Sequence, residues 1–444
     1  MVGRVPNPAL ETPSTDTRHT GSRLPPVPTS EVLIVSEGSE LSERTPPDES
    51  NRTAALLGLY LVSFTNALGS QTLVTLIPEY AVLFQASPYW IGAFTTAFAL
   101  AGTVIVLPVG WLSDRVGKAT VLRWGLAVSI VSYILFLFAH DEVTFAVGRV
   151  IQGIGITSGA MTSLALVGEI AGEGERGRMI GTFNSIRNMS GAIGAAAAGW
   201  MLGQFGILAP NVVLIIVSIT ALFLVSRSRH MDSFDVARAR GFPLTLLARS
   251  TAIQAMAAFR VLYGFGVVMT RTFVPIYVGI TLGLGPLYVG LVISAEQTVN
   301  MLFQRFTGSL SDRFGRFPMV TLGGCLYAVG LVILTTQRTP YALIAANGFL
   351  GLADAIREPA SMAAFADEGQ KTGSVGSAFA IRQILWRPSM VLAPMMGGAV
   401  MAALGVRSVF YLALAFTIAG VLGVRLVLTL RGTSDGVRQA TSQH

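Results

Sequence analysis

Long apolar stretches separated by short polar ones fill the chain from about residue 54 to residue 430. Each stretch is about 20 residues or longer, which is enough for a helix to cross the hydrocarbon core of a bilayer. The stretches lie at 54–83, 90–112, 119–139, 142–168, 179–203, 207–227, 251–281, 287–307, 317–336, 341–366, 374–401 and 406–430. The pattern predicts an all-α membrane protein with twelve transmembrane helices.

Polar segments before, between and after the apolar stretches divide the chain. Residues 1–53 are rich in Pro, Ser, Thr and Glu and lack apolar periodicity, which predicts a disordered tail. An arginine-bearing connector is expected at 228–250, between six-helix bundles at 54–227 and 251–430. A second tail is expected at 431–444.

One polar motif occurs twice. The nine residues from Gly110 to Lys118 (GWLSDRVGK) recur as the nine from Gly308 to Arg316 (GSLSDRFGR), 198 positions later (308 − 110). A pattern that repeats at one offset predicts two pseudo-symmetric halves. Duplicated membrane halves are typical of secondary transporters.

Composition supports a membrane protein without a cofactor. Hydrophobic residues make up 52% of the chain and charged residues 12%, against about 25% charged residues in a soluble domain. The one cysteine, Cys325, lies in an apolar stretch, and the four histidines show no ligand spacing, so no metal or other cofactor is predicted. The sequence has no phosphate-binding loop, so an ion gradient should supply the energy.

The net charge of +7 is distributed unevenly between the two sides of the predicted membrane. Connections after even-numbered stretches hold Arg115, Lys118, Arg123, Arg176, Arg178, the connector arginines, Arg313, Arg316 and Lys371. Connections after odd-numbered stretches hold only Arg338 and Arg407. Because positive loops stay in the cytoplasm, we expect a plasma-membrane protein with both termini cytoplasmic and no nucleic-acid partner.

With two six-helix halves that each carry the loop motif, the chain resembles the major facilitator superfamily over residues 54–430. The resemblance implies the major facilitator fold, a substrate site between the two bundles and alternating access by rocking of the bundles. It also implies that the protein is not an enzyme and that a monomer suffices for function.

A second resemblance lies in the fourth stretch. Residues 149–155 (RVIQGIG) are similar to the Arg-x-x-Gln-Gly-x-Gly motif of proton-coupled drug antiporters. This implies a coupling role for Arg149 and a cavity position for Gln152. The Gly-Pro step that these antiporters carry in the fifth stretch is Ala195-Ala196 here, so the resemblance supports an exporter more than any particular coupling.

Charged residues inside the apolar stretches are candidates for proton coupling. An ionised group near the bilayer centre costs roughly 2.5–3.5 kcal/mol and so needs a cavity or a partner. The candidates are Asp354, Glu296, Arg149, Glu358 and Glu79. The charged residues of 354–358 are spaced to share one helix face. The alternative is structural: a salt-bridge cluster on this helix and, for Glu296, an ion pair with an arginine such as Arg271 or Arg387.

Polar residues of the apolar stretches are candidates for the substrate cavity. They are Asn66, Gln71, Gln152, Arg187, Arg271, Asn347, Arg357 and Arg382. Arg187 and Arg382 are related by the repeat at an offset of 195 (382 − 187). As a pair they can bind an anionic substrate, or they can neutralise the intramembrane acids.

The loop motifs supply a predicted conformational latch. Its residues are Gly110, Asp114, Arg115, Gly117, Asp312, Arg313 and Gly315. An acid and a base at this position can pair with helix ends in one conformation and separate in the other. The alternative is a tight turn with inside-positive charge.

Together these features predict a secondary active transporter that exports hydrophobic or cationic small molecules in exchange for protons, by alternating access. One alternative is a uniporter or symporter for an organic anion or metabolite, favoured by the number of intramembrane arginines. Another is a membrane sensor or scaffold that keeps the fold and transports nothing.

Overall fold

The computed structural model describes residues 49–170, 176–227, 250–371 and 375–441. The predicted N-terminal tail up to residue 48 and the predicted connector from 228 to 249 lie outside the described residues. Within the described ranges the secondary structure is helical, without a strand.

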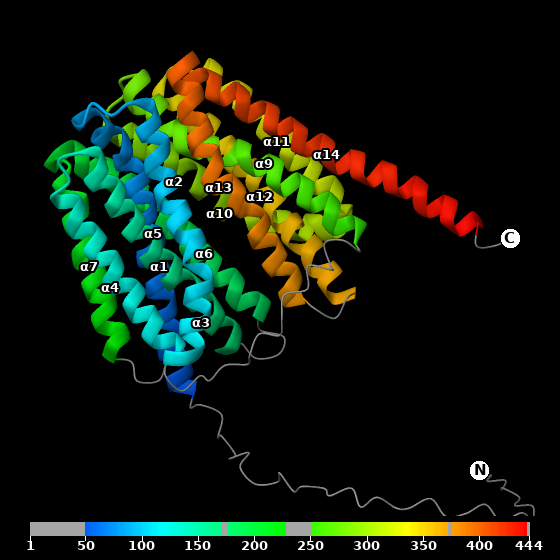
Figure 1. The fold of residues 1–444 in the computed structure, drawn as a ribbon, viewed down its shortest axis with the longest axis horizontal. Coiled ribbons are helices and arrows are strands. Elements are labelled where there is room, and N and C mark those ends of the chain that lie inside the picture. Colours follow the sequence, from blue (N-terminus) through cyan, green and yellow to red (C-terminus); the bar gives the residue numbers. More distant parts are fainter. Residues whose placement is uncertain (1–48, 171–175, 228–249, 372–374, 442–444) are drawn as a thin grey trace, which may run out of the picture. The chain divides into compact units, whose positions relative to one another are not determined.

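The helices follow one another in two similar series (Figure 1). The first series is α1 Glu49–Leu83, α2 Pro88–Val104, α3 Val106–Val116, α4 Lys118–Leu137, α5 Glu142–Ile170, α6 Arg176–Phe205 and α7 Leu208–Arg227. The second is α9 Thr251–Ile276, the π-helical η2 Tyr277–Thr281, α10 Pro286–Phe314, α11 Arg316–Thr336, α12 Pro340–Lys371, α13 Val375–Leu404 and α14 Val406–Thr441.

Each predicted apolar stretch coincides with one helix or with two adjoining helices. The second stretch is α2 and α3, bent by 43°. Pro108, in the first turn of α3, has no backbone N–H to donate to the preceding turn, which accounts for the bend. The seventh stretch is α9 continued by η2.

The membrane class is confirmed, and the number of twelve spans remains a prediction. Seven of the described helices are long and apolar enough to cross a membrane, and eight if the bent pair is one span. The other four, α6, α10, α12 and α13, carry Arg, Asp or Glu within their length, which lowers their hydropathy.

Two helices extend into segments predicted to be tails. α1 begins at Glu49 rather than near residue 54, and α14 runs to Thr441 rather than ending near residue 430. Once a helix is nucleated, each further residue adds a hydrogen bond without the cost of a new nucleus. A long apolar helix therefore continues easily into polar sequence.

The repeated motif forms the same one-residue turn in both halves. Gly117 connects α3 to α4 with a φ of +88°, and Gly315 connects α10 to α11 with a φ of +90°. Glycine takes this conformation without a steric penalty from Cβ. We call the end of the bundle with these two turns the proximal end. The opposite end, with the connections at 282–285, 337–339 and Gly405, is the distal end.

The two halves meet closely near the distal end, through the helix pairs α2–α13 and α6–α10. A Cβ at Gly92 of α2 would lie 2.3 Å from the carbonyl oxygen of Pro394 in α13. A Cβ at Gly290 of α10 would lie 2.4 Å from the carbonyl oxygen of Ala195 in α6. Small residues let the backbones approach this far, so the halves are closed against each other here.

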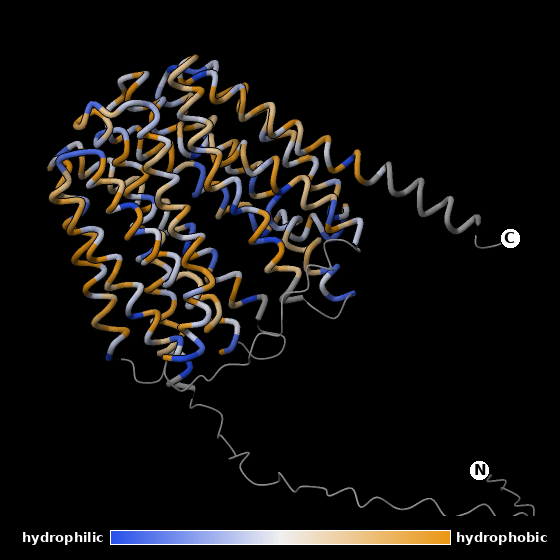
Figure 2. The backbone as a smooth tube through the Cα atoms, viewed as in Figure 1, coloured by the Kyte–Doolittle hydropathy of each residue, from blue (hydrophilic) through white to orange (hydrophobic). Residues whose placement is uncertain are grey.

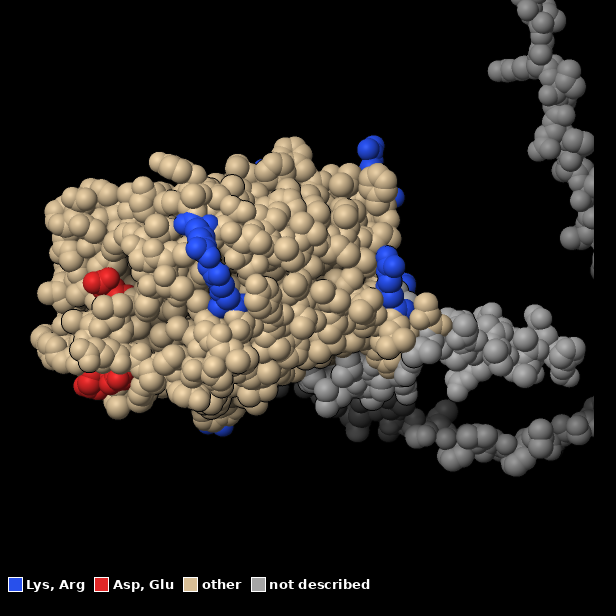
Figure 3. Space-filling view, turned by 90° about the horizontal axis from the view of Figure 1, so that it is seen from above, with Lys and Arg blue, Asp and Glu red and all other residues tan. Residues whose placement is uncertain are grey.

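Polar and apolar residues are distributed as a bilayer requires. Hydrophobic residues follow the helices along most of their length, whereas hydrophilic ones lie near several helix ends and also within the helices of the C-terminal half (Figure 2). The face seen from above in Figure 3 shows few charged side chains.

Candidate functional site

An ion-pair bridge joins three helices inside the C-terminal half. Arg271 of α9 donates from Nε to Glu296 of α10 and from Nη2 to Asp354 of α12, each at 2.7 Å. The carboxyl side chains are 7% and 2% exposed, whereas the Arg271 side chain is 41% exposed. One solvent-accessible guanidinium therefore holds two buried carboxylates. Of the two partners proposed for Glu296 from the sequence, the structure selects Arg271.

Asp354 has a second cationic partner, whereas Glu296 has one such partner among the described residues. Arg357, one turn later in α12, donates to Asp354 Oδ1 from Nε at 3.0 Å and from Nη2 at 2.8 Å. The Tyr263 hydroxyl donates to the same oxygen at 3.2 Å. Among the described charged residues, Glu296 pairs with Arg271 alone. Its ionised form is therefore stabilised through a single cation.

Glu358 forms ion pairs with three arginines. Its Oε2 lies 2.9 Å from Nη1 of Arg357 and 3.6 Å from Nη1 of Arg260, and its Oε1 accepts from Arg382 of α13. The predicted common face of residues 354–358 is thus a single chain of ion pairs. We call the following seven residues the charge network: Arg260, Arg271, Glu296, Asp354, Arg357, Glu358 and Arg382. It contains one more guanidinium than carboxylates.

The N-terminal half lacks this network at the corresponding positions. The positions 198 residues earlier are apolar: Leu73 for Arg271, Phe98 for Glu296 and Ile156 for Asp354. Buried charges are costly, and apolar residues of similar size can replace them without loss of folding. The C-terminal half therefore carries ion pairs that the N-terminal half lacks at the corresponding positions.

Arg187 of α6 approaches the network from the N-terminal half. Its side chain is exposed, and it forms no hydrogen bond or ion pair with any residue in the described part of the chain. The charges of Glu358, Arg271 and Arg382 act on its guanidinium. Its repeat mate, Arg382, is instead buried and paired.

Arg149 and Gln152 form a separate, buried cluster in the N-terminal half. Arg149 donates from Nε to the carbonyl of Phe94 at 3.1 Å and from Nη1 to Gln152 Oε1 at 2.5 Å. Its guanidinium lies 4.7 Å from the centre of the Phe98 ring. Gln152 donates on to the carbonyl of Gly69 at 3.4 Å. Arg149 ties α5 to α2 and has no carboxylate partner among the described residues.

Three further candidates are not members of the charge network, although Asn347 lies within reach of Glu296. Asn347 donates to the carbonyl of Val292 at 2.6 Å and packs α12 on α10. Asn66 is buried, with its amide nitrogen against Gly159 of α5. Glu79 is exposed, one turn before the distal end of α1.

Amide side chains occupy the junction between the halves, below the closed distal contacts. Asn188 of α6 donates to Asn300 of α10 at 3.1 Å. A Cβ at Gly191 of α6 would lie 3.2 Å from Gln71 Cγ and 3.9 Å from Gln297 Cδ. Sequence reasoning proposed Gln71 and missed Asn188, whose partner is 112 residues away.

At the proximal end, the last residue of each loop motif pairs with an acid on a neighbouring helix. Lys118 pairs with Glu169 of α5, and Arg316 pairs with Asp367 of α12 at 3.0 Å. Glu169 and Asp367 are themselves 198 positions apart (367 − 169). Sequence reasoning missed both acids, although the repeat offset would have identified them.

The residues predicted as a latch are only partly engaged. Asp312 pairs with Arg316 within the turn, and the Arg115 guanidinium lies 4.0 Å from the centre of the Trp111 ring. Asp114 and Arg313 form no hydrogen bond or ion pair with described residues, and Gly110 has open space beside it. A latch that includes these residues remains a prediction.

These features define a class: a helical membrane protein of two related halves, with an amide junction between them and buried ion pairs in one half. The chain belongs to the major facilitator superfamily, whose family model matches residues 59–285 and 256–443. Members of this superfamily are transporters and not enzymes, and this chain is a transporter.

Relatives and a solved structure resemble most of the chain. The tetracycline resistance protein, class G, of Vibrio anguillarum is 27% identical over 319 residues, 68% of this chain and 80% of that protein. The synaptic vesicular amine transporter of Homo sapiens is 23% identical over 329 residues, 69% of this chain and 61% of that protein. A bacterial homolog of the human lysosomal transporter Spinster, solved in an inward-facing and unoccupied conformation, superposes with a TM-score of 0.71 at 12% identity, over 86% of this chain and 98% of that one.

Proposed function

We propose that the protein exports hydrophobic or cationic small molecules in exchange for protons, and that Glu296 takes up and releases the proton. The observation that carries this proposal is the sharing of Arg271 between Glu296 and Asp354. When Glu296 is protonated, Arg271 still has a carboxylate partner. The proton therefore removes one ion pair and leaves no buried charge without a partner. A buried charge without a partner would be strongly destabilising.

Proton uptake on Glu296 acts on the contact between the halves. The ion pair holds α10 to α9, and α10 is the helix whose Gly290 packs against α6 of the other half. Loss of this pair weakens the contact between α10 and α9 and changes the relative free energies of the two rocking states. The Arg271 side chain is 41% exposed, which supports access of a proton to the pair.

The substrate class rests on the amide junction and on the relatives. Gln71, Asn188, Gln297 and Asn300 offer neutral donors and acceptors between the halves, which suit a largely apolar ligand with a few polar groups. The relatives named for tetracycline resistance and for amine transport support the same class.

The membrane orientation follows from the charges. Arg115, Lys118, Arg313 and Arg316 lie at the proximal end, so we propose that this end faces the cytoplasm, as do both termini, in the plasma membrane. The closed distal contacts then correspond to an inward-facing state. A single chain contains both halves and suffices for transport.

The test uses purified protein in liposomes with a pH-sensitive dye and an imposed pH gradient. Addition of a lipophilic cation should trigger proton flux in the wild type. Glu296→Gln should abolish this flux, whereas Glu79→Gln, which removes an exposed acid outside the network, should keep it. Proton flux absent with a broad panel of cations, or unchanged in Glu296→Gln, would overturn the proposal.

One observation favours a second candidate, transport of an organic anion. Arg187 is exposed and unpaired among the described residues, beside a network that already has an excess of arginine. A guanidinium in this position can bind a carboxylate or phosphate group. Flux that does not depend on pH would favour this candidate.

A further inference from the structure

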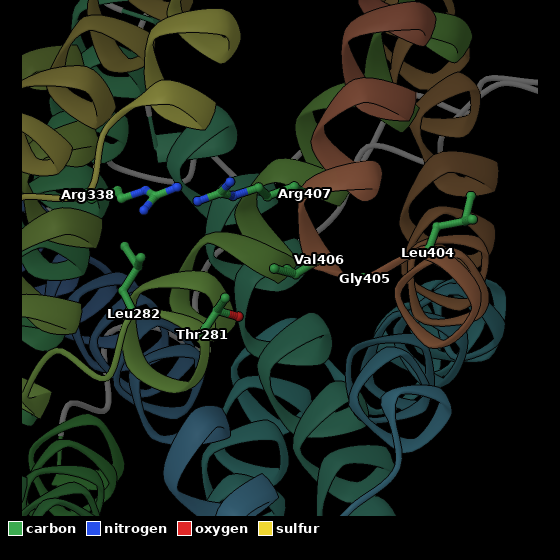
Figure 4. A pocket seen from close by; sticks show the side chains of 7 residues that line it. All are labelled: Thr281, Leu282, Arg338, Leu404, Gly405, Val406 and Arg407. Atoms are coloured by element: carbon green, nitrogen blue, oxygen red, sulfur yellow. The ribbon is translucent and has the colours of Figure 1, made fainter.

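A pocket of about 390 Å³ opens at the distal end of the C-terminal half, away from the charge network. Three segments form it: the end of η2 with Thr281, the connection before α12 with Arg338, and the turn from α13 to α14 with Gly405 and Arg407. Figure 4 shows the guanidinium ends of Arg338 and Arg407 pointing toward each other across the pocket.

The two arginines have no counter-charge among the residues that the structure describes. Neither guanidinium forms a hydrogen bond or ion pair with any residue in the described ranges. Two positive charges that point toward each other without an acid between them repel each other. An anion between them would attract both and would outweigh this repulsion. Arginine presents its donors in a planar fork that matches the oxygens of a phosphate or carboxylate.

The backbone on both sides of the pocket is held in place. The Tyr277 hydroxyl donates to the carbonyl of Gln337, next to Arg338, at 3.1 Å. Gly405, with a φ of +83°, makes the turn that places Arg407 in the first turn of α14.

The repeat shows that the fold does not need these arginines. Gly206 makes the corresponding turn in the N-terminal half, with a φ of +77°. The residue two positions after this turn glycine is Leu208 in the N-terminal half and Arg407 in the C-terminal half. A second pair of positions lies two residues before α5 and two residues before α12. The first is His140 and the second is Arg338. The arginine pair is therefore an addition to a shared scaffold.

We propose that this pocket binds a phosphate-type anion at the distal membrane surface. The phosphate can belong to a lipid headgroup or be free in solution, because both present the same oxygens to Arg338 and Arg407. The wall of the pocket includes Leu404, whose side chain is 72% exposed, so an apolar chain can continue from the bound group along the helix. The proposal is independent of the substrate and of proton coupling.

The experiment measures thermal unfolding of the full-length protein in detergent. Three additions are compared: phosphatidylglycerol, phosphatidylcholine and inorganic phosphate at matched ionic strength. We expect phosphatidylglycerol or inorganic phosphate to raise the unfolding temperature of the wild type. The double variant Arg338→Gln/Arg407→Gln should bind that ligand about tenfold or more weakly, because two charge-assisted hydrogen-bond donors are lost.

Matched variants complete the design. Arg305→Gln/Arg425→Gln removes two exposed arginines elsewhere and should respond like the wild type. Arg338→Lys/Arg407→Lys keeps the charge and should retain part of the response, which shows that the pocket variants fold. Stabilisation by phosphatidylglycerol alone identifies a lipid headgroup, and stabilisation by both ligands identifies a general phosphate site. Equal responses in the wild type and Arg338→Gln/Arg407→Gln, or no response in the wild type, would overturn the proposal.

Discussion

Gly199 of α6 and Gly290 of α10 face each other across the boundary between the halves. A Cβ at Gly290 would lie 3.2 Å from the Cα of Gly199 and 2.4 Å from the carbonyl oxygen of Ala195. Because these neighbours are backbone atoms, they cannot rotate away. The distal closure therefore depends on the absence of a side chain at position 290.

Gly290→Ala should open the distal end. Overpacking costs about 1–3 kcal/mol, so the equilibrium between states should shift roughly tenfold or more away from the closed arrangement. The measurement is the labelling rate of Gln297→Cys by a membrane-impermeant thiol reagent added from the distal side, in a Cys325→Ser background. Gly203→Ala, where a Cβ meets nothing within 4 Å, is the control. Equal labelling in the two alanine variants would contradict a closure made by backbone contact.

The proximal ion pairs should differ in their importance for stability. Glu169→Gln leaves Lys118 buried without its partner, which should cost about 1–3 kcal/mol. Asp367→Asn should cost less, because Arg316 keeps Asp312 and is partly exposed. Thermal unfolding of both variants in detergent shows which one has the larger decrease in unfolding temperature. A larger decrease for Asp367→Asn would show that the pairs are assigned wrongly.

Replacement of Asp114 distinguishes a role in the conformational latch from a role in thermal stability. It forms no hydrogen bond or ion pair with described residues, so Asp114→Asn should leave the unfolding temperature unchanged. If Asp114 pairs in the other conformation, the same variant should slow transport several-fold without loss of substrate binding. Transport at the wild-type rate, at equal expression, would exclude the latch.

The ion-pair bridge at Arg271 predicts that a second substitution at Glu296 restores part of the stability lost in Arg271→Met. Arg271→Met leaves Glu296 and Asp354 without their shared cation, which should destabilise the protein by about 1–3 kcal/mol after allowance for the exposure of the arginine. Adding Glu296→Gln should recover part of this loss, because Glu296 has no second arginine among the described residues, whereas Asp354 keeps Arg357. Thermal unfolding at neutral pH of the single and double variants gives the coupling directly, and purely additive effects would argue against a shared bridge.

Arg187 separates the two proposed substrate classes. For a cationic substrate, Arg187→Ala should leave affinity unchanged or improve it, because a nearby positive charge is removed. For an anionic substrate it should weaken binding about tenfold or more. Equilibrium binding of lipophilic cations and of organic anions to both proteins decides the matter, with Arg149→Ala as a variant that removes a buried arginine outside the charge network.

The sequence predicted the class of fold because two strong signals agreed. Apolar stretches of bilayer length predicted where the helices lie. The repeated glycine-containing motif predicted two related halves, each with a proximal turn. The charges at 354–358 were placed correctly on one face, since their spacing lies within a single helix. The bend between α2 and α3 was missed, although Pro108 supplies its cause.

Contacts between distant helices could not be derived in the same way. The sequence left Glu296 with two possible arginines, and only packing of α9 on α10 selects Arg271. Nothing local to Asp354 shows that it shares that arginine. Similarly, the pairing of Asn188 with Asn300 depends on how the halves dock, which helical periodicity does not specify.

Proton coupling through Glu296 can be tested by comparing two transport modes of the Glu296→Gln variant. The measurement uses a labelled lipophilic cation in proteoliposomes, followed once as exchange without a pH gradient and once as accumulation driven by a gradient. We expect Glu296→Gln to retain exchange and to lose gradient-driven accumulation, because the rocking motion no longer requires a proton. Accumulation at the wild-type level in Glu296→Gln would mean that another group carries the proton.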